Sequence, residues 1–322
     1  MRHIVSLLAM MLGTTSLAAQ GDPQCDIPAS QPATRACNTA VDAIRAFHPL
    51  AGMIVSGGNP ALGTTGSLGG IGHFSLTARV NGIKAALPNP DSASQSSVPA
   101  SFHGVIPAPL VEGAIGLVGG KGGFLSVDAL GSALVLPTSG VSGLSVDSNA
   151  AHVGGAALGI GYGARVGVLG GRFPIPAVSI SWMHRTLPRI QYGSLGPTFG
   201  TGDQFEFNMD LRADNYRAVA SWKFVLLDLA AGLGLDHYTS SATNIRFHDN
   251  PLAPANVKTI VINPSNTREV LFVDGGLNLA ALKLVAELGF QTGKDQSFAT
   301  TFRDFDPKAG HVFGGVGVRF GF

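Results

Sequence analysis

Residues 204–214 read QFEFNMDLRAD, and this stretch decides the fold. Its apolar and polar side chains alternate without a break: Phe205, Phe207, Met209, Leu211 and Ala213 are separated by Glu206, Asn208, Asp210, Arg212 and Asp214. Because successive residues of a strand point to opposite faces, this period of two predicts a two-faced β-strand. The same alternation recurs at 73–81, 125–135 and 312–322, so strands dominate the chain.

The connections between the strands alternate in length. Short turns are expected near 119–123, 170–172, 225–228 and 280–282, and long polar loops near 88–101, 137–149, 188–203, 236–268 and 292–309. This order predicts about ten strands, or alternatively twelve, in an up-and-down arrangement with all long loops at one end. The face parity slips near Asp214 to Tyr216, which we interpret as a β-bulge.

The composition excludes several classes of protein. The 322 residues are 45% hydrophobic and only 13% charged, with 44 glycines and a formal net charge of +1. Such hydrophobicity excludes a disordered chain, and the balanced charge argues against nucleic acid as a partner. No segment after the first twenty residues has the roughly 18 consecutive apolar residues of a membrane-spanning helix.

The N-terminus has the features of an export signal. Arg2 and His3 precede an apolar run at 4–12 and a small-residue exit, which predicts a signal peptide over residues 1–19. The two cysteines, Cys25 and Cys37, follow closely. In an oxidising compartment they are expected to form a disulfide; lipid attachment and metal binding fit the surrounding residues less well. No metal or cofactor site is expected.

Residues 20–70 are expected to form a small plug. Helical spacing predicts a helix over 38–48, stopped by Pro49, before a short strand at 50–56 and a glycine-rich turn region at 57–72. A segment this small does not support an independent domain, so we expect it to pack into the mouth or lumen of the larger domain at 71–322.

A soluble two-sheet sandwich and a transmembrane barrel would both produce alternating strands. Glycine and alanine occupy one face at 155–163, which suits a crowded interior better than a solvated exterior. We therefore predict an all-β, up-and-down antiparallel transmembrane barrel surrounded by outer-membrane lipid. An even strand count places both termini on the periplasmic side. The side chains of Trp182, Trp222, Tyr192 and Tyr216 are expected at the membrane interfaces.

The last strand carries a resemblance. Residues 314–322 read GGVGVRFGF, with Val316, Val318, Phe320 and Phe322 alternating up to a terminal phenylalanine. This resembles the C-terminal assembly signal of bacterial outer-membrane β-barrel proteins, which implies that location and recognition by the barrel assembly machinery. The stretch GNPALG at 58–63 is similar to an Asn-Pro-Ala element of the outer-membrane long-chain fatty acid transporter family. That family has more strands, so its ligand sites are not transferred.

Charged residues on the expected inward face are nearly balanced in sign. They are Arg79, Glu112, Asp128, Arg165, Arg185, Glu206, Asp210, Arg212, Arg217, Asp274, Glu287 and Arg319. Ten strands leave a narrow lumen, so an ion-paired filling and a selectivity filter both fit this set. We expect a passive transporter or pore-like protein for a small or apolar solute, gated by the N-terminal segment. The alternative is a structural or adhesive closed barrel with binding outer loops.

An enzymatic role has weak support in the sequence. Asp236, His237 and Ser240 supply an acid, a base and a nucleophile within one short stretch. Adjacent residues of a strand point to opposite faces, so Asp236 does not readily orient His237. We therefore expect no catalytic residues, and an outer-membrane hydrolase is the third possibility after the two above.

Overall fold

The computed structural model describes residues 21–27, 30–63, 66–120, 125–138, 141–147, 150–172, 174–279, 282–294 and 296–321. The predicted signal peptide lies outside this range. The helices are η1 (Pro23–Cys25), α1 (Gln31–Ser56) and η2 (Pro90–Ser92). The strands are β1 (Phe74–Pro88), β2 (Ala100–Val118), β3 (Ser126–Pro137), β4 (Leu144–Val146), β5 (His152–Val153), β6 (Ala156–Arg172), β7 (Ile175–Tyr192), β8 (Phe205–Lys223), β9 (Leu227–Thr239), β10 (Thr243–His248), β11 (Val257–Ile262), β12 (Ser265–Leu279), β13 (Leu282–Gln291) and β14 (His311–Gly321).

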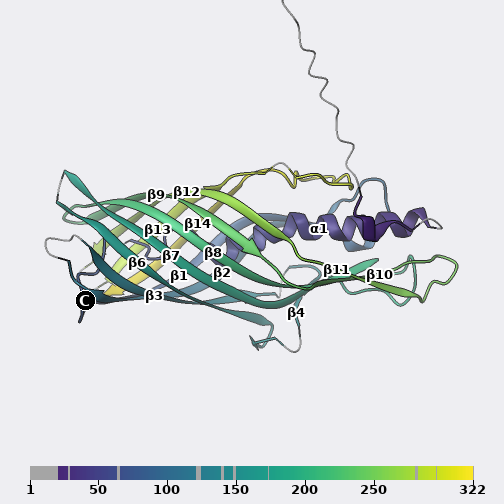
Figure 1. Cartoon of the computed structure of the whole chain (residues 1–322), viewed down its shortest axis with the longest axis horizontal. Helices are drawn as coiled ribbons and strands as arrows, with labels where there is room; N and C mark the ends of the chain where they lie inside the picture. The colour runs from purple at the N-terminus through teal and green to yellow at the C-terminus, as the bar shows by residue number, and fades with distance from the viewer. Residues whose placement is uncertain are drawn as a thin grey trace, which may run out of the picture.

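Ten long strands of the described chain close into one antiparallel barrel (Figure 1). They follow the order β1, β2, β3, β6, β7, β8, β9, β12, β13 and β14, and β14 pairs back onto β1 with Leu76 opposite Phe320. Short turns join the strands at one end, which we name the turn end, and long connections join them at the other, the loop end. The predicted ten-stranded up-and-down barrel is confirmed, and the twelve-stranded alternative is not.

The shorter strands all extend the loop end. β10 and β11 form a hairpin that continues from β8, with Phe247 opposite Phe205, while β4 pairs with β7 and β5 with β6. In Figure 1 the labelled strands β10 and β11 lie at the same end of the molecule as the start of α1, which runs from there into the barrel. In the described part of the chain, no helix combines the length and the apolar composition that a membrane-crossing helix needs.

The barrel wall has two halves of opposite polarity, and β8 shows the change. Toward the loop end its inward residues are apolar, from Phe205 to Ala213, while the exterior carries residues such as Arg212. Toward the turn end the inward residues are Asn215 and Arg217, and Tyr216 is exposed outside. The burial pattern keeps one parity throughout, so the predicted bulge near Asp214 to Tyr216 is wrong. What changes there is the content of the lumen.

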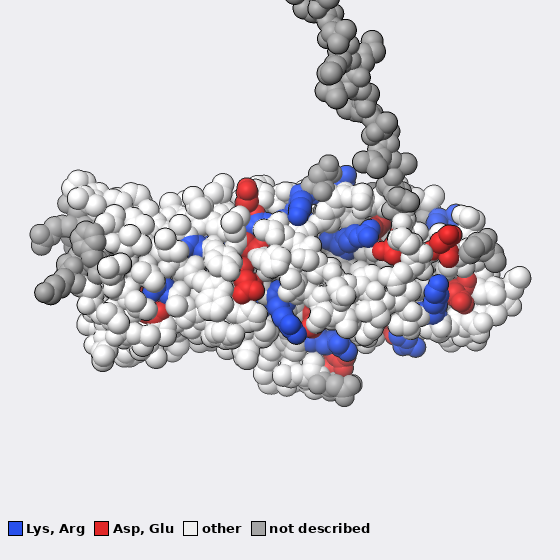
Figure 2. Space-filling model, viewed as in Figure 1, with Lys and Arg blue, Asp and Glu red and all other residues white. Residues whose placement is uncertain are grey.

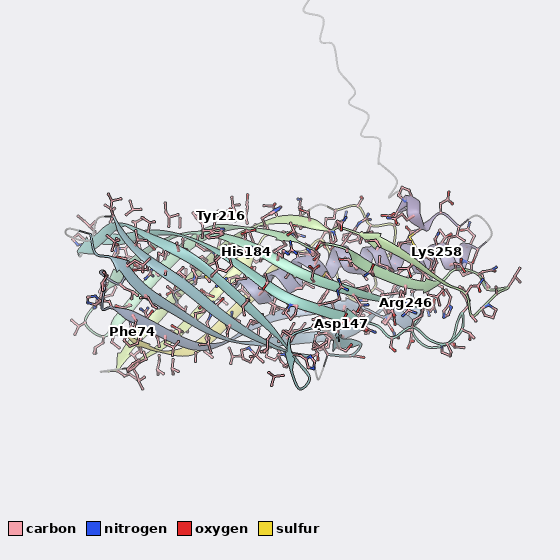
Figure 3. All side chains as sticks on the ribbon, turned by 60° about the horizontal axis from the view of Figure 1, so that its bottom comes forward. Phe74, Asp147, His184, Tyr216, Arg246 and Lys258 are labelled. Carbon is pink, nitrogen blue, oxygen red and sulfur yellow. A yellow bond between two sulfur atoms is a disulfide. The ribbon has the colours of Figure 1, made fainter. Side chains whose placement is uncertain are left out.

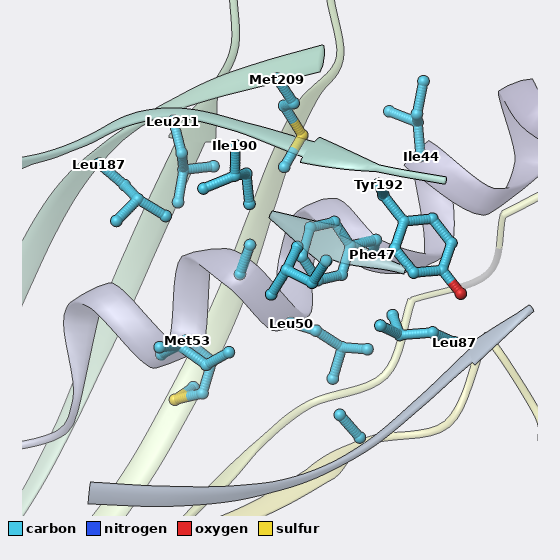
Figure 4. Packing of buried hydrophobic residues seen from close by; sticks show 14 of the residues in the cluster. Ile44, Phe47, Leu50, Met53, Leu87, Leu187, Ile190, Tyr192, Met209 and Leu211 are labelled. Atoms are coloured by element: carbon cyan, nitrogen blue, oxygen red, sulfur yellow. The ribbon is translucent and has the colours of Figure 1, made fainter. Parts of the chain in front are cut away.

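The first half of that lumen is filled by α1. Ser30 caps the helix, its Oγ accepting a hydrogen bond from the Ala33 amide at 3.2 Å. The Phe47 ring packs against Tyr192 of the barrel wall at a centroid distance of 6.3 Å (Figure 4). It also packs against Phe207 at a centroid distance of 6.2 Å. Leu50 and Met53 are buried in the same cluster. Burial of each such side chain contributes about 1.5–3 kcal/mol, and this packing sets the position of the helix.

The helix is longer than the sequence predicted. It runs from Gln31 to Ser56 with Pro49 inside it, so neither the predicted end at Pro49 nor the strand at 50–56 exists. A proline inside a helix costs about 3 kcal/mol because it removes one backbone hydrogen bond. The buried residues Leu50, Met53 and Ile54 on the following turns offset that cost.

The predicted disulfide is confirmed. Cys25 of η1 and Cys37 of α1 are joined, with their Cα atoms 5.4 Å apart. The bond ties the start of the described chain to the side of the helix, and both cysteines are fully buried.

The described N-terminal segment starts at the loop end, whereas the start of β1 and the end of β14 lie together at the turn end. Arg35 Nε donates to the Ser94 carbonyl at 2.7 Å, and the Thr300 amide donates to Asp42 Oδ2 at 2.8 Å, both partners lying in long loops. Further along, the Leu68 amide donates to Asp128 at 3.2 Å near the turn end. The segment therefore passes along the lumen before β1 begins.

Candidate functional site

The end of α1 meets the barrel wall at a sharp bend. Gly57 ends the helix at φ 59°, and its amide donates to the Met53 carbonyl. A side chain at Gly57 would be disfavoured by this φ and would place its Cβ 2.7 Å from Arg79 Nη2. A Cβ at Gly58 would lie 2.4 Å from Glu287 Oε2. The two glycines thus allow charged side chains of the wall to reach the backbone.

Seven buried charged residues surround this bend, and we name them the central clamp. Each comes from a different strand, and each is at most 5% exposed: Arg79 (β1), Glu112 (β2), Arg185 (β7), Arg217 (β8), Asp236 (β9), Asp274 (β12) and Glu287 (β13). Three arginines face four carboxylates. Because unpaired buried charges are costly, the position of the segment inside the clamp depends on how these groups are satisfied.

The arginines of the clamp hold the carbonyl groups of the bend. Arg217 donates to the Gly57 carbonyl at 2.8 Å and to the Gly58 carbonyl at 3.0 Å, and it pairs with Asp236 at 2.6 Å. Arg185 donates to the Ser56 carbonyl and pairs with Glu112 at 2.7 Å. The free carbonyls at the helix end, which lack partners within the helix, are satisfied in this way.

The carboxylates of the clamp hold the amide groups. Glu287 accepts from the Gly58 amide at 3.1 Å and from the Asn59 amide at 2.6 Å. Asp274 accepts from Asn59 Nδ2 at 2.9 Å and from the Gly63 amide at 3.2 Å. The Asn59-Pro60-Ala61 element is therefore held by the barrel wall through its backbone and through one amide side chain.

A second polar layer lies closer to the turn end. Arg165 pairs with Asp128 at 2.7 Å, and Asp128 also accepts from the Leu68 amide. Lys283 contacts Asp228 and donates to the Gly63 carbonyl at 2.8 Å, while Arg319 donates to the Leu62 carbonyl at 3.3 Å. The second half of the segment is thus also held by polar contacts.

Nine of the twelve residues expected to line the lumen take part in these two layers, namely Arg79, Glu112, Asp128, Arg165, Arg185, Arg217, Asp274, Glu287 and Arg319. The other three do not face the lumen. Glu206 pairs with Arg246, Asp210 accepts from the Ser241 amide at 3.0 Å, and Arg212 is exposed. These three residues lie in the loop-end half of β8, where apolar residues point inward against α1.

Three more charged residues contribute to the polar layers and were not predicted from the sequence to face the lumen: Asp228, Asp236 and Lys283. On β9 the alternation of Leu227, Leu229, Leu233 and Leu235 with smaller residues would have placed both aspartates inside, as the burial pattern shows. Asp236 was considered only beside His237, and the structure does place the two on opposite faces. His237 Nδ1 lies 3.0 Å from Thr267 Oγ1 on the exterior.

The residues expected in the assembly signal and at the membrane interfaces lie in different parts of the barrel. On the exterior of β14, Val316 and Val318 are exposed, Phe320 packs on Phe74, and Phe322 lies outside the described residues. Tyr216 is exposed near His184, as Figure 3 shows. Tyr192 is instead buried inside the barrel against Phe47, so its expected interfacial position is wrong.

Within the described residues, no group of three or more His, Cys, Asp or Glu side chains is placed to hold a metal ion. The polar layers therefore offer hydrogen bonds and ion pairs, made mostly to the backbone of the N-terminal segment. Such contacts can exchange with water, because water supplies both donors and acceptors.

Comparison with known proteins found similarity only at the level of solved structures. No protein-family model matches the chain. No curated protein matches it either. The outer-membrane protease OmpT of Escherichia coli is 10% identical, with 78% of this chain and 96% of that chain covered and a TM-score of 0.36. The translocator domain of the autotransporter NalP from Neisseria meningitidis is 12% identical, with 87% of this chain and 97% of that chain covered and a TM-score of 0.39. The toluene transporter TbuX of Ralstonia pickettii is 11% identical, with 82% of this chain and 91% of that chain covered and a TM-score of 0.30.

Proposed function

We propose that this protein is a passive channel of the bacterial outer membrane, closed by its N-terminal segment. The observation that carries the proposal is the central clamp. It holds the segment in the lumen by hydrogen bonds and ion pairs, and a second polar layer continues them toward the turn end. A permanently closed barrel would be more stable with an apolar filling, since buried ion pairs gain little over well-packed hydrophobic residues.

The exterior of the turn-end half supports a membrane location. Leucines at 227, 229, 233 and 235 of β9 are all exposed there, and the next outward residue is His237. This apolar band spans about nine residues, the length that a tilted strand needs to cross a bilayer. Figure 2 shows few charged side chains over this half of the visible face, and many over the loop-end half. We infer that the change of polarity on β8 near Tyr216 marks the outer membrane surface.

The N-terminal segment provides the gate in this proposal. In the closed state its backbone amides and carbonyls satisfy the clamp, as at Gly58, which is bonded through both groups. Water that enters the lumen can replace these partners one by one. Release of the segment from the clamp therefore leaves the arginines and carboxylates hydrated rather than buried without partners.

The lining of the turn-end lumen favours a small polar solute over an apolar one. Residues such as Ser75, Thr77 and Ser179 face inward beside the two charged layers. An apolar solute would displace the hydrogen-bond partners of these groups and could not replace them. Each group left without a partner costs about 1–3 kcal/mol. We therefore narrow the expected solute to a small polar molecule.

Conductance of the full chain and of a clamp variant in planar bilayers tests the proposal. Glu287→Gln removes the negative charge that pairs with Arg79 and accepts from Gly58 and Asn59. We expect it to open more often than the unaltered chain. Glu269→Gln is the matched control, because Glu269 is exposed on the exterior of β12.

If all three proteins show the same negligible conductance and no uptake of small solutes, the channel proposal is wrong. That result favours a structural or adhesive closed barrel. The hairpin of β10 and β11 and the loops around it would then be the contact surface. We also propose that the last strand, with Val316 and Val318 on its outer face, is what the assembly machinery recognises.

A further inference from the structure

A cavity lies at the loop end, away from the central clamp. It has a volume of about 490 Å³ and lies between α1, the start of β12 and residues 294, 296 and 297. Its lining includes Arg45, His48, Asn263, Asn266 and Lys294. Among the described residues, no hydrogen bond or ion pair joins these side chains to the clamp, and the cavity lies at the loop end of the barrel.

The floor of this cavity holds buried polar groups that lack partners. His48 is 1% exposed, and neither of its ring nitrogens has a hydrogen-bond partner in the described part of the chain. The same holds for Asn266 Oδ1, which also lines the cavity. Gln291 Oε1 and Arg268 Nε, which are not part of the lining, also lack a partner among the described residues. A buried polar group without a partner costs about 1–3 kcal/mol, so a cluster of them indicates a site that a polar molecule completes.

The chemistry of the floor selects the class of molecule. Two cations line the cavity: Arg45 is already paired with Asp22 at 3.4 Å and with Asp42 at 3.1 Å, and Lys294 is exposed to solvent. Burial lowers the pKa of His48 to about 3, with smaller contributions from His237 and Arg268, so its ring is neutral at pH 7. A neutral imidazole offers one donor and one acceptor, and each amide offers both. Hydroxyl groups match such a mixed surface, whereas a carboxylate can only accept.

We propose that this cavity binds a small neutral polyhydroxylated solute, a polyol or a free sugar, with His48 and Asn266 as its hydrogen-bonding floor. From there a line of polar groups leads toward the clamp. Gln291 Nε2 donates to the Tyr238 hydroxyl at 2.8 Å, and that hydroxyl donates to Asp236 at 2.8 Å. The role of the cavity as the outer binding site of a channel rests on the proposed function, but the binding itself does not.

Titration of the purified full-length protein with glucose by isothermal calorimetry tests the binding, with glycolate as the anionic comparison. We expect saturable glucose binding and none for glycolate at the same concentrations. His48→Phe and Asn266→Leu should each weaken glucose binding by roughly tenfold, because each removes at least one hydrogen bond in a desolvated position. His237→Phe is the matched control, since His237 lies on the exterior of β9 and should leave binding unchanged.

The outcomes are distinct. Absence of glucose binding, equal binding by all variants, or a preference for glycolate would each overturn the proposal. His48→Phe removes two unpartnered polar atoms and keeps an aromatic ring, so we expect it to fold; Asn266→Leu provides the independent second variant. Glucose binding without conductance in the Glu287→Gln protein would refute the channel and leave the binding site intact.

Discussion

Arg217 is the residue whose loss should disturb the closed state most. Its guanidinium group donates to the Gly57 and Gly58 carbonyls and pairs with Asp236, all at 3.0 Å or less. Arg217→Met keeps an unbranched apolar side chain but removes every one of these contacts. Asp236 is then buried without its cation, and the helix end loses two hydrogen bonds.

The magnitude follows from these contacts. Removal of one partner from a buried ion pair costs about 3–5 kcal/mol. Asn215 Nδ2 and the Tyr238 hydroxyl still donate to Asp236, at 2.7 and 2.8 Å, so the lower end of that range applies. About 3 kcal/mol corresponds to an increase of roughly a hundredfold in the population with the segment released.

Amide hydrogen exchange of residues 50–63, followed by mass spectrometry, measures that population directly. Arg212→Met is the control, because Arg212 is exposed on the exterior of the same strand, and its loss should change stability by no more than about 0.5 kcal/mol. Arg217→Met combined with Asp236→Leu removes both charges and should recover most of the lost stability. Equal exchange in Arg217→Met and Arg212→Met, or no recovery in the double variant, would refute the reasoning.

Three further predictions concern the packing of α1, the packing of the barrel wall at β6 and the titration of His48. Phe47→Ala should cost about 3–5 kcal/mol of α1 docking, seen as faster exchange along the helix while the barrel stays folded; unchanged exchange would contradict the packing described above. Gly161→Val would place a Cβ 2.4 Å from Ser132 Oγ and 2.6 Å from Arg185 Cγ, and should lower the melting temperature of the barrel, whereas the outward-facing Ile160→Val should not. The pKa of His48 is lowered to about 3, from 6.5 in the unfolded chain. The stability that neutral His48 allows is therefore complete above pH 6.5 and is lost as the pH falls below it. At pH 5 the loss is about 2 kcal/mol, so the protection of α1 amides, measured relative to the intrinsic exchange rate at each pH, should fall at pH 5 in the unaltered chain and not in His48→Phe.

Much of the fold was predictable because strand alternation is a local property. The alternation in 73–81, 125–135 and 312–322, together with the spacing of turns and loops, was enough to predict ten strands and their order. The pairing of Cys25 with Cys37 was predictable because the chain offers no other cysteine. These features depend on neighbours in the chain and not on what fills the lumen.

The candidate site was only partly predictable, for a physical reason. Period two shows that two sets of residues lie on opposite faces of a strand, but it does not show which set faces inward. On β8 the same inward parity is apolar at Phe207, beside α1, and charged at Arg217, beyond the end of α1. Glu206, Asp210 and Arg212 were therefore assigned to the wrong face.

The sequence by itself determined that this chain forms a closed antiparallel barrel with a disulfide-tied helix before it. Only the tertiary structure decided that α1 continues through Pro49 and that Gly57 and Gly58 meet seven charges drawn from seven strands. Strand order follows from local alternation and turn length. The clamp depends on contacts between residues more than a hundred positions apart, such as Gly58 with Glu287, and no local pattern encodes that distance.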